Sequence, residues 1–292
     1  MPVGELAALS AAVIWAIASL IYARVGMHIP PLWLNFLKGG VAIALMLLTL
    51  LLQRQGLAIP LPGLGLLLLS GLWGIGLGDS CYFQALRAIG ARRTLLLEML
   101  CPVLATLAAW PLLGERLGAT EVMAIAVILA GVAWVVSEQT ETEPLHRLGP
   151  GVLWALGAVI GQVGGVLLSR LALTRTGVDP LQSSLVRLCS AQVALGLLLR
   201  LQGSPWPLQG MVRRDRDRLL AVVAVTSFLG AYLGIWLQQT SLRLTPAGVS
   251  QALTSTSPVF VLLLSALAGR RVSLRAWLGT AIALGGVVRL LV

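Results

Sequence analysis

The sequence has few charged side chains, and fewer still of the residues that usually bind metals or carry out hydrolysis. Charged residues make up 11% of the chain, against about a quarter in ordinary soluble domains, which excludes a soluble globular domain. Two histidines and three cysteines are present, with no CxxC, no HExxH and no Cys/His cluster. We therefore expect no disulfide framework, no metal site and no cofactor.

Long apolar segments dominate what is there. Hydrophobic residues make up 58% of the chain, in runs separated by Arg, Gly and Pro, and a run of about 20 residues can cross a bilayer as a helix. We expect an all-α polytopic membrane protein without a soluble domain. The runs predict ten transmembrane helices, at residues 3–24, 31–53, 62–86, 93–113, 119–137, 149–171, 179–201, 218–242, 248–268 and 273–291.

The two halves of the chain repeat one pattern. Gly74 and Pro102 in the first half correspond to Gly230 and Pro258 in the second, at one constant offset. Each half holds an odd number of predicted helices, so the second half enters the membrane from the opposite side. We expect two inverted-topology five-helix repeats, over residues 1–138 and 149–292, joined by a polar linker at residues 139–148.

Two cations occupy the same repeat position inside apolar helices. Lys38 is the only lysine, and the second half places Arg187 at the matching point. A cation at the bilayer centre costs roughly 2.5 to 3.5 kcal/mol, so such residues are retained for pathways, pairs or substrates. This placement indicates a membrane transporter in which Lys38 and Arg187 contact an anionic substrate group. The alternative for Arg187 is to cap carbonyls or snorkel toward water.

A series of short motifs lies in the same order along the chain as in one transporter family. They are Trp15, Lys38, the stretch 82–90 leading into 100–103, Leu113-Gly114-Glu115 and Gly131. With these motifs the chain resembles the EamA-type branch of the drug/metabolite transporter superfamily. The resemblance implies two five-helix repeats, a central cavity and alternating access. In the second half, Arg270-Arg271 stands where Gly114-Glu115 stands in the first.

Lys38, Asp79 and Glu98 are predicted to lie at one depth. Counted from the same membrane face at 1.5 Å per residue, all three fall at about 7 to 10 Å. They could meet in one cavity, where Asp79 or Glu98 would accept a proton or a substrate ammonium. The alternative is a buried ion pair that only holds helices together. Arg187 has no acid at a matching depth in its own half.

Other residues are expected to shape the cavity or to let it move. We assign the cavity wall to Trp15 and Tyr82, facing an aromatic and amide wall of Tyr232, Trp236 and Gln239. Further substrate contacts are assigned to Gln251 and Thr254 in an unusually polar helix. Pro102 and Pro258 interrupt apolar helices and can act as hinges or as static kinks. Glycines four residues apart predict close helix approach, at Gly74/Gly78, Gly161/Gly165 and Gly230/Gly234.

The function expected is secondary transport, not catalysis. We predict export of a small polar metabolite, such as an amino acid, across a bacterial inner membrane, by a monomer or weak homodimer. The partners would be the solute, the lipid bilayer and, as a candidate coupling ion, protons. Nucleic acid is not expected as a partner, because the arginines that give the net charge of +10 lie mostly at helix ends.

Two other function classes stay open as alternatives. One is a channel or a non-transporting membrane scaffold. The other is an intramembrane hydrolase built on Gly78-Asp79-Ser80, which is disfavoured because the only histidines, His28 and His146, fall in or near loops. Orientation also stays open: with cytoplasmic termini about 6 arginines would face inward and about 13 outward, against the positive-inside rule, whereas the family resemblance favours cytoplasmic termini.

Overall fold

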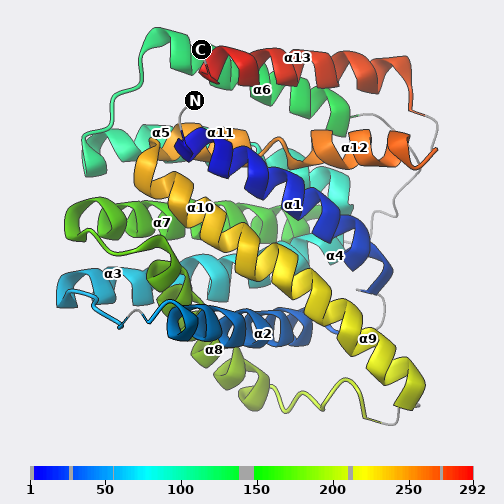
Figure 1. Cartoon of the computed structure of the whole chain (residues 1–292). Coiled ribbons are helices and arrows are strands. Elements are labelled where there is room, and N and C mark those ends of the chain that lie inside the picture. Colours follow the sequence, from blue (N-terminus) through cyan, green and yellow to red (C-terminus); the bar gives the residue numbers. More distant parts are fainter. Residues whose placement is uncertain are drawn as a thin grey trace.

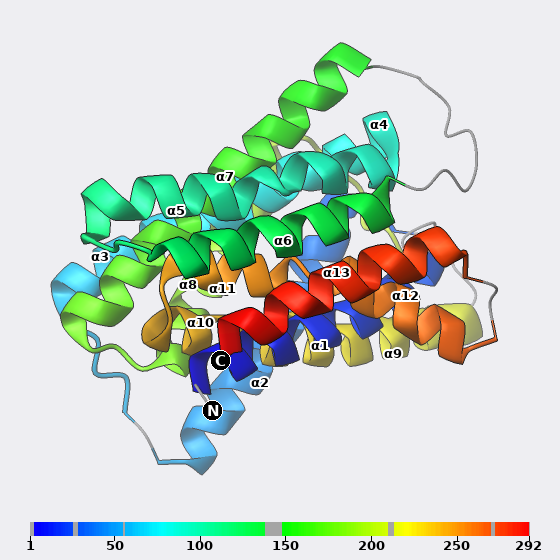
Figure 2. The same cartoon turned by 90° about the horizontal axis from the view of Figure 1, so that it is seen from above.

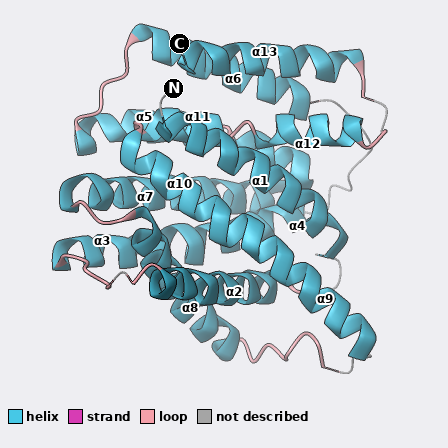
Figure 3. Cartoon of the chain, viewed as in Figure 1, coloured by secondary structure: helices cyan, strands magenta, loops and turns pink. Residues whose placement is uncertain are grey.

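The computed structural model describes residues 3–25, 29–54, 56–137, 148–209, 213–269 and 272–291. Over these residues the chain forms helices and no strand (Figure 3). Ten helical stretches are long and apolar enough to cross a membrane, which confirms the predicted all-α polytopic class. We number them span 1 to span 10 in chain order. Most of the predicted linker, residues 139–147 of 139–148, lies outside the described residues.

Spans 1 to 5 form the first half. Spans 1 and 2 are α1 (Val3–Val25) and α2 (Pro31–Leu52). Span 3 consists of α3 (Leu61–Ser70), η1 (Gly71–Gly78) and the first part of α4 (Asp79–Glu98). The chain stays helical into span 4, which consists of the end of α4 and α5 (Leu100–Leu113). Span 5 is α6 (Ala119–Val136).

Spans 6 to 10 form the second half. Spans 6 and 7 are α7 (Leu148–Thr176) and α8 (Pro180–Leu201). Span 8 consists of α9 (Arg213–Thr226), η2 (Ser227–Leu233) and α10 (Gly234–Leu244). Span 9 consists of α11 (Ala247–Thr254) and α12 (Ser257–Leu267), and span 10 is α13 (Leu274–Leu291).

Both halves depart from regular α-helix at the same repeat positions. The π-helical segments η1 and η2 correspond to each other at the offset that relates Gly74 to Gly230. Spans 4 and 9 break at Met99 and at Ser255, again at that offset. Pro258 lies in the first turn after its break, where its missing N–H removes no helical hydrogen bond. The predicted interruptions are therefore present in the structure, while their movement stays a prediction.

The two halves pack against each other by reciprocal contacts. α1 lies against α10, η2 and α9 of span 8, and α7 lies against α3, η1 and α4 of span 3. α2 packs on α8, α5 on α11 and α6 on α13; the long contact of α6 with α13 runs along one edge of the bundle (Figures 1 and 2). The two chain ends lie close together (Figure 1). The centre of the protein is thus an interface between the repeats.

Glycines make close contacts between span 3 and α7. A Cβ on Gly78 would lie 3.3 Å from the carbonyl carbon of Gly161, and one on Gly74 would lie 3.2 Å from the Cα of Gly165. The small-residue pairs predicted in spans 3 and 6 therefore face each other. Without side chains between them, the two backbones approach closely enough for van der Waals contact along the seam.

Gly165→Ala is expected to destabilise this seam. The new Cβ would lie 2.8 Å from the Cα of Gly74, a backbone atom that cannot rotate away, and overpacking of this kind costs about 1–3 kcal/mol. The unfolding temperature of the purified protein should fall. Gly65→Ala is the matched control, because a Cβ there meets nothing within 4 Å. Equal unfolding temperatures for the two variants would contradict the tight seam.

Candidate functional site

Five predicted site residues come together at the centre of the bundle. Asp79 at the start of α4 lies within electrostatic reach of Lys38 on α2 and Arg187 on α8. Glu98 at the end of α4 interacts in the same way with Asp79 and with Tyr82. These five residues, which we call the central polar cluster, come from spans 2, 3, 4 and 7. The equal depths predicted for Lys38, Asp79 and Glu98 agree with this arrangement.

The glycines of η1 allow Arg187 to reach the cluster. A Cβ on Gly71 would overlap the backbone carbonyl of Arg187, so glycine at this position lets α8 lie directly on η1. Nη2 of Arg187 lies 3.5 Å from the point that a Cβ on Gly74 would occupy. The guanidinium thus passes over η1 toward Asp79. Arg187, which has no acid in its own half, therefore has an acidic neighbour in the other half.

The cluster has unmet hydrogen-bonding capacity. Arg187 is 2% exposed, and its Nε and Nη1 atoms are enclosed without a hydrogen-bond partner. Lys38, Asp79 and Glu98 are half-buried, and the ion pairs formed among the described residues all lie elsewhere in the chain. Buried polar groups nearly always have partners. The static ion pair considered as an alternative for these residues is therefore not formed, and the cluster could bind a polar solute.

Gln239 on α10, predicted to belong to the cavity wall with Tyr232 and Trp236, is a neighbour of the cluster. It is fully buried, its Oε1 accepts hydrogen bonds from the Ser183 hydroxyl at 2.9 Å and from the Ser169 hydroxyl, and its Nε2 has no partner. Ser183 lies one turn before Arg187 on the same face of α8. The sequence signal for Gln239 was its i, i+4, i+7 spacing with Tyr232 and Trp236, whereas its hydrogen bonds to the two serines required the structure.

The aromatic residues are arranged differently from the prediction. Nε1 of Trp15 donates to the carbonyl of Gly230 at 2.9 Å, and the indole covers Gly234. The Tyr232 hydroxyl instead shares a hydrogen bond of 2.7 Å with Thr49 on α2, and its ring lies 5.9 Å from that of Trp236. Positions two residues apart lie on opposite sides of a helix. The expectation that Trp15 faces Tyr232 and Trp236 across a cavity is therefore corrected.

Gln251 and Thr254 form a separate polar group. Oε1 of Gln251 accepts from Nε2 of Gln238 at 3.5 Å, and the Thr254 hydroxyl donates back to the carbonyl of Ser250 at 3.1 Å. Both side chains are buried on α11, which packs against α5, α1 and α10. Among the described residues, neither of them forms a hydrogen bond or ion pair with the central polar cluster.

Ser80, the nucleophile of the hydrolase alternative, is hydrogen-bonded within its own helix. The Ser80 hydroxyl donates to the carbonyl of Gly76, four residues earlier in its own helix, at 2.5 Å. His28 and His146 lie outside the described residues. The Ser80 hydroxyl is therefore occupied by a carbonyl of its own helix.

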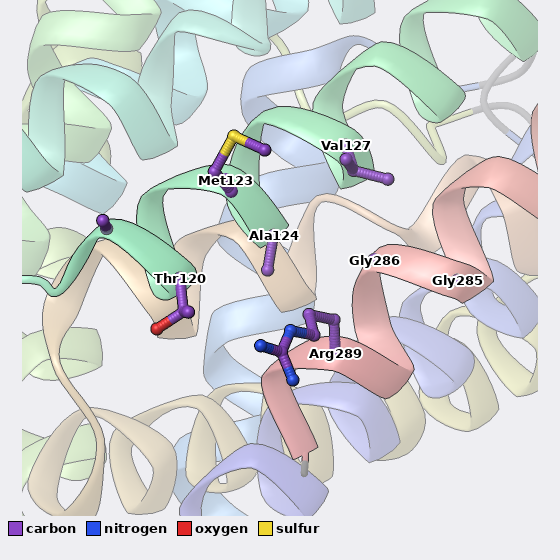
Figure 4. Close-up of a pocket in the computed structure, with 8 residues that line it drawn as sticks. Thr120, Met123, Ala124, Val127, Gly285, Gly286 and Arg289 are labelled. Atoms are coloured by element: carbon purple, nitrogen blue, oxygen red, sulfur yellow. The ribbon is translucent and has the colours of Figure 1, made fainter.

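A surface hollow lies between α6 and α13 (Figure 4). Its volume is 360 Å³, and Gly285 and Gly286 of α13 line it, the first beside open space. Met123 and Val127 on its rim are exposed, as expected for a surface that lipid covers. Arg289 is its one charged lining residue, and no predicted site residue lines it.

Comparison with known proteins gives matches at the level of family and fold. The model of the EamA-like transporter family matches residues 2–137 and again residues 149–292. Of 29 matching solved chains, one titled only "Crystal structure of protein" has a TM-score of 0.79 at 23% identity, and the match covers 98% of this chain and 96% of that one. It shows a shared fold. None of the curated proteins compared with the chain matches it.

Proposed function

The chain belongs to the EamA-like transporter family, and from that premise we propose that it is a secondary carrier that moves a small polar metabolite with an anionic group, such as an amino acid. One observation carries the proposal. The central polar cluster holds four ionisable groups from different spans, and Arg187 among them is buried with two unpartnered nitrogens. A solute carboxylate could satisfy these donors, since carboxylates accept paired hydrogen bonds from arginine.

Each charged residue has a distinct part in this proposal. Arg187, assisted by Lys38, binds the anionic group of the solute. Asp79 and Glu98 balance charge by binding a solute ammonium or by carrying a proton. Tyr82, half-buried beside both acids, bounds the site on the α4 side. Gln251 and Thr254 provide a second polar surface on span 9.

The repeated architecture supports alternating access. The two halves are inverted copies that contact each other through every span, and both contain a π-helical segment in the third span and a break in the fourth. Irregular helix segments of this kind often lie at functional sites. Pro102 and Pro258 lie beside the two breaks, where a change of angle would move the outer half of spans 4 and 9. The proposal includes export across a bacterial inner membrane.

Metabolite exchange in proteoliposomes tests the proposed function. Liposomes containing the protein are loaded with an isotope-labelled metabolite pool, diluted into an unlabelled pool, and analysed by mass spectrometry. A carrier gives saturable, solute-specific counterflow, which Lys38→Ala should weaken. Rapid, non-saturating flux would indicate a channel, and absence of any exchange would support a scaffold.

A further inference from the structure

One buried ion pair joins the two halves away from the central polar cluster. Nε of Arg170 on α7 lies 2.6 Å from Oε1 of Glu115, and the two side chains are only 11% and 14% exposed. Glu115 follows α5, which ends at Gly114 with a φ of 72°, a left-handed conformation that glycine adopts freely. The turn brings the carboxylate back over the helix ends. Arg170 therefore pairs with a residue of the other repeat.

The pair also holds the turn between spans 8 and 9. Oε2 of Glu115 accepts from the backbone N–H of Ala247, the first residue of α11, at 2.8 Å. Nη1 of Arg170 donates to the carbonyl of Leu242 near the end of α10. The acid thus satisfies a free donor at one helix start, and the guanidinium satisfies an acceptor at the preceding helix end. Four helix segments, from both repeats, meet at these two side chains.

The surroundings of this pair are closely packed. A side chain on Gly4 of α1 would overlap the hydroxyl of Thr245, and one on Gly248 would overlap that of Thr106 on α5. The same end of the bundle holds the starts of α1 and α11 and the ends of α5 and α10. We call it the terminal face, because the chain begins there. In this structure the terminal face is closed, and the first half contacts the span 8–9 turn without a gap.

The sequence allows such a pair at one face only. At the constant repeat offset, Gly114-Glu115 corresponds to Arg270-Arg271 in the second half. An arginine there cannot accept the hydrogen bonds that Glu115 accepts. In an exactly symmetric inverted repeat, the state closed at one face and the state closed at the other would have equal free energies. A carboxylate present at one face only makes these two free energies unequal.

The geometry points to Glu115 and Arg170 as the gate of the terminal face. This inference rests on the proposed carrier function. Opening the face separates α5 from α7 and from the span 8–9 turn, and so breaks the contacts to Arg170 and Ala247 together. The pair stabilises the state that is closed at this face, and without it the closed and open states differ less in free energy. Solute access from the terminal face then becomes more frequent.

Cysteine labelling tests the gate without any transported solute. The reporter is Ser241→Cys, fully buried beside Leu242, in a chain whose own cysteines Cys81, Cys101 and Cys189 are replaced. Purified protein is treated with a membrane-impermeant maleimide. Glu115→Gln and Arg170→Gln should each raise the labelling rate about tenfold, within the range usual for coupled sites. The double variant should resemble the single ones, because either change removes the same contact.

Two controls distinguish a gate at the terminal face from an ion pair that only stabilises the whole fold. Arg175→Gln changes an exposed arginine on the same helix and should leave labelling unchanged. Thr226→Cys, equally buried in span 8 but toward the other face, should label slowly in every variant. Unchanged Ser241→Cys labelling in Glu115→Gln would overturn the gate, as would a parallel rise at both reporters with a lower unfolding temperature. Absence of metabolite exchange would overturn the carrier proposal instead, and would not alter these labelling rates.

Discussion

Arg187→Gln should abolish transport while the protein stays folded. The guanidinium is 2% exposed, and its Nε and Nη1 have no partner, so in the proposed site it makes its hydrogen bonds to the solute. Each hydrogen bond to a charged group is worth about 1.5–3 kcal/mol, or about 10- to 100-fold in binding. Exchange of the metabolite identified in proteoliposomes, measured at a concentration that half-saturates the unaltered protein, should fall by at least that factor.

Stability distinguishes this role from a structural one. A buried cation without a close partner is costly, so its removal should leave the unfolding temperature unchanged or raise it. A structural arginine would show the reverse, with stability lost and transport lost in proportion. Arg200→Gln, at the exposed end of the same helix, is the matched control and should change neither property. Full exchange by a folded Arg187→Gln protein would contradict the site assignment.

The double variant Asp79→Asn/Glu98→Gln should lose accumulation driven by a pH gradient. Asp79 and Glu98 are close enough to interact and form no ion pair, so either can hold the proton that accompanies the solute. Neutral amides cannot bind or release a proton in the relevant range. Accumulation should fall to the level of empty liposomes, while solute exchange without a gradient continues at a reduced rate.

The control for the Asp79→Asn/Glu98→Gln double variant is Glu121→Gln. Glu121 lies in the first turn of α6, where its side chain accepts from the backbone N–H of Gly118, far from the cluster in sequence and packed in a different span. It should accumulate the solute normally. Undiminished pH-driven accumulation by the Asp79/Glu98 double variant would remove proton coupling through these residues from the account.

The helices were predictable because membrane spans are specified locally. A run of about 20 apolar residues between Arg, Gly or Pro forms a helix regardless of its neighbours, and the predicted spans agree with the structure to within a few residues at most ends. The depth relation among Lys38, Asp79 and Glu98 was predictable for the same reason, since rise per residue is constant. The π-helical segments were not, because the glycines of η1 are equally compatible with a regular α-helix.

Contacts between the two halves could be identified only from the structure. The proximity of Arg187 to Asp79 depends on α8 lying directly on η1, which no spacing within one half reveals. The sequence shows that Glu115 has no acidic counterpart at the matching position of the second half. It does not identify Arg170 as the ion-pair partner, because Arg170 lies on a different helix in the other repeat. Tyr232 was expected to face Trp15. In the structure Trp15 bonds one side of span 8, at Gly230, whereas the Tyr232 hydroxyl bonds Thr49 on the opposite side.

Binding of the exchanged solute to purified protein tests the central claim most directly, that Arg187 in the central polar cluster holds its anionic group. The measurement is the rise in unfolding temperature caused by saturating solute, in the unaltered protein and in Arg187→Gln. The account predicts a concentration-dependent rise in the unaltered protein and none in the variant, although both fold. An equal rise in the two proteins would place the anion site elsewhere and contradict the account.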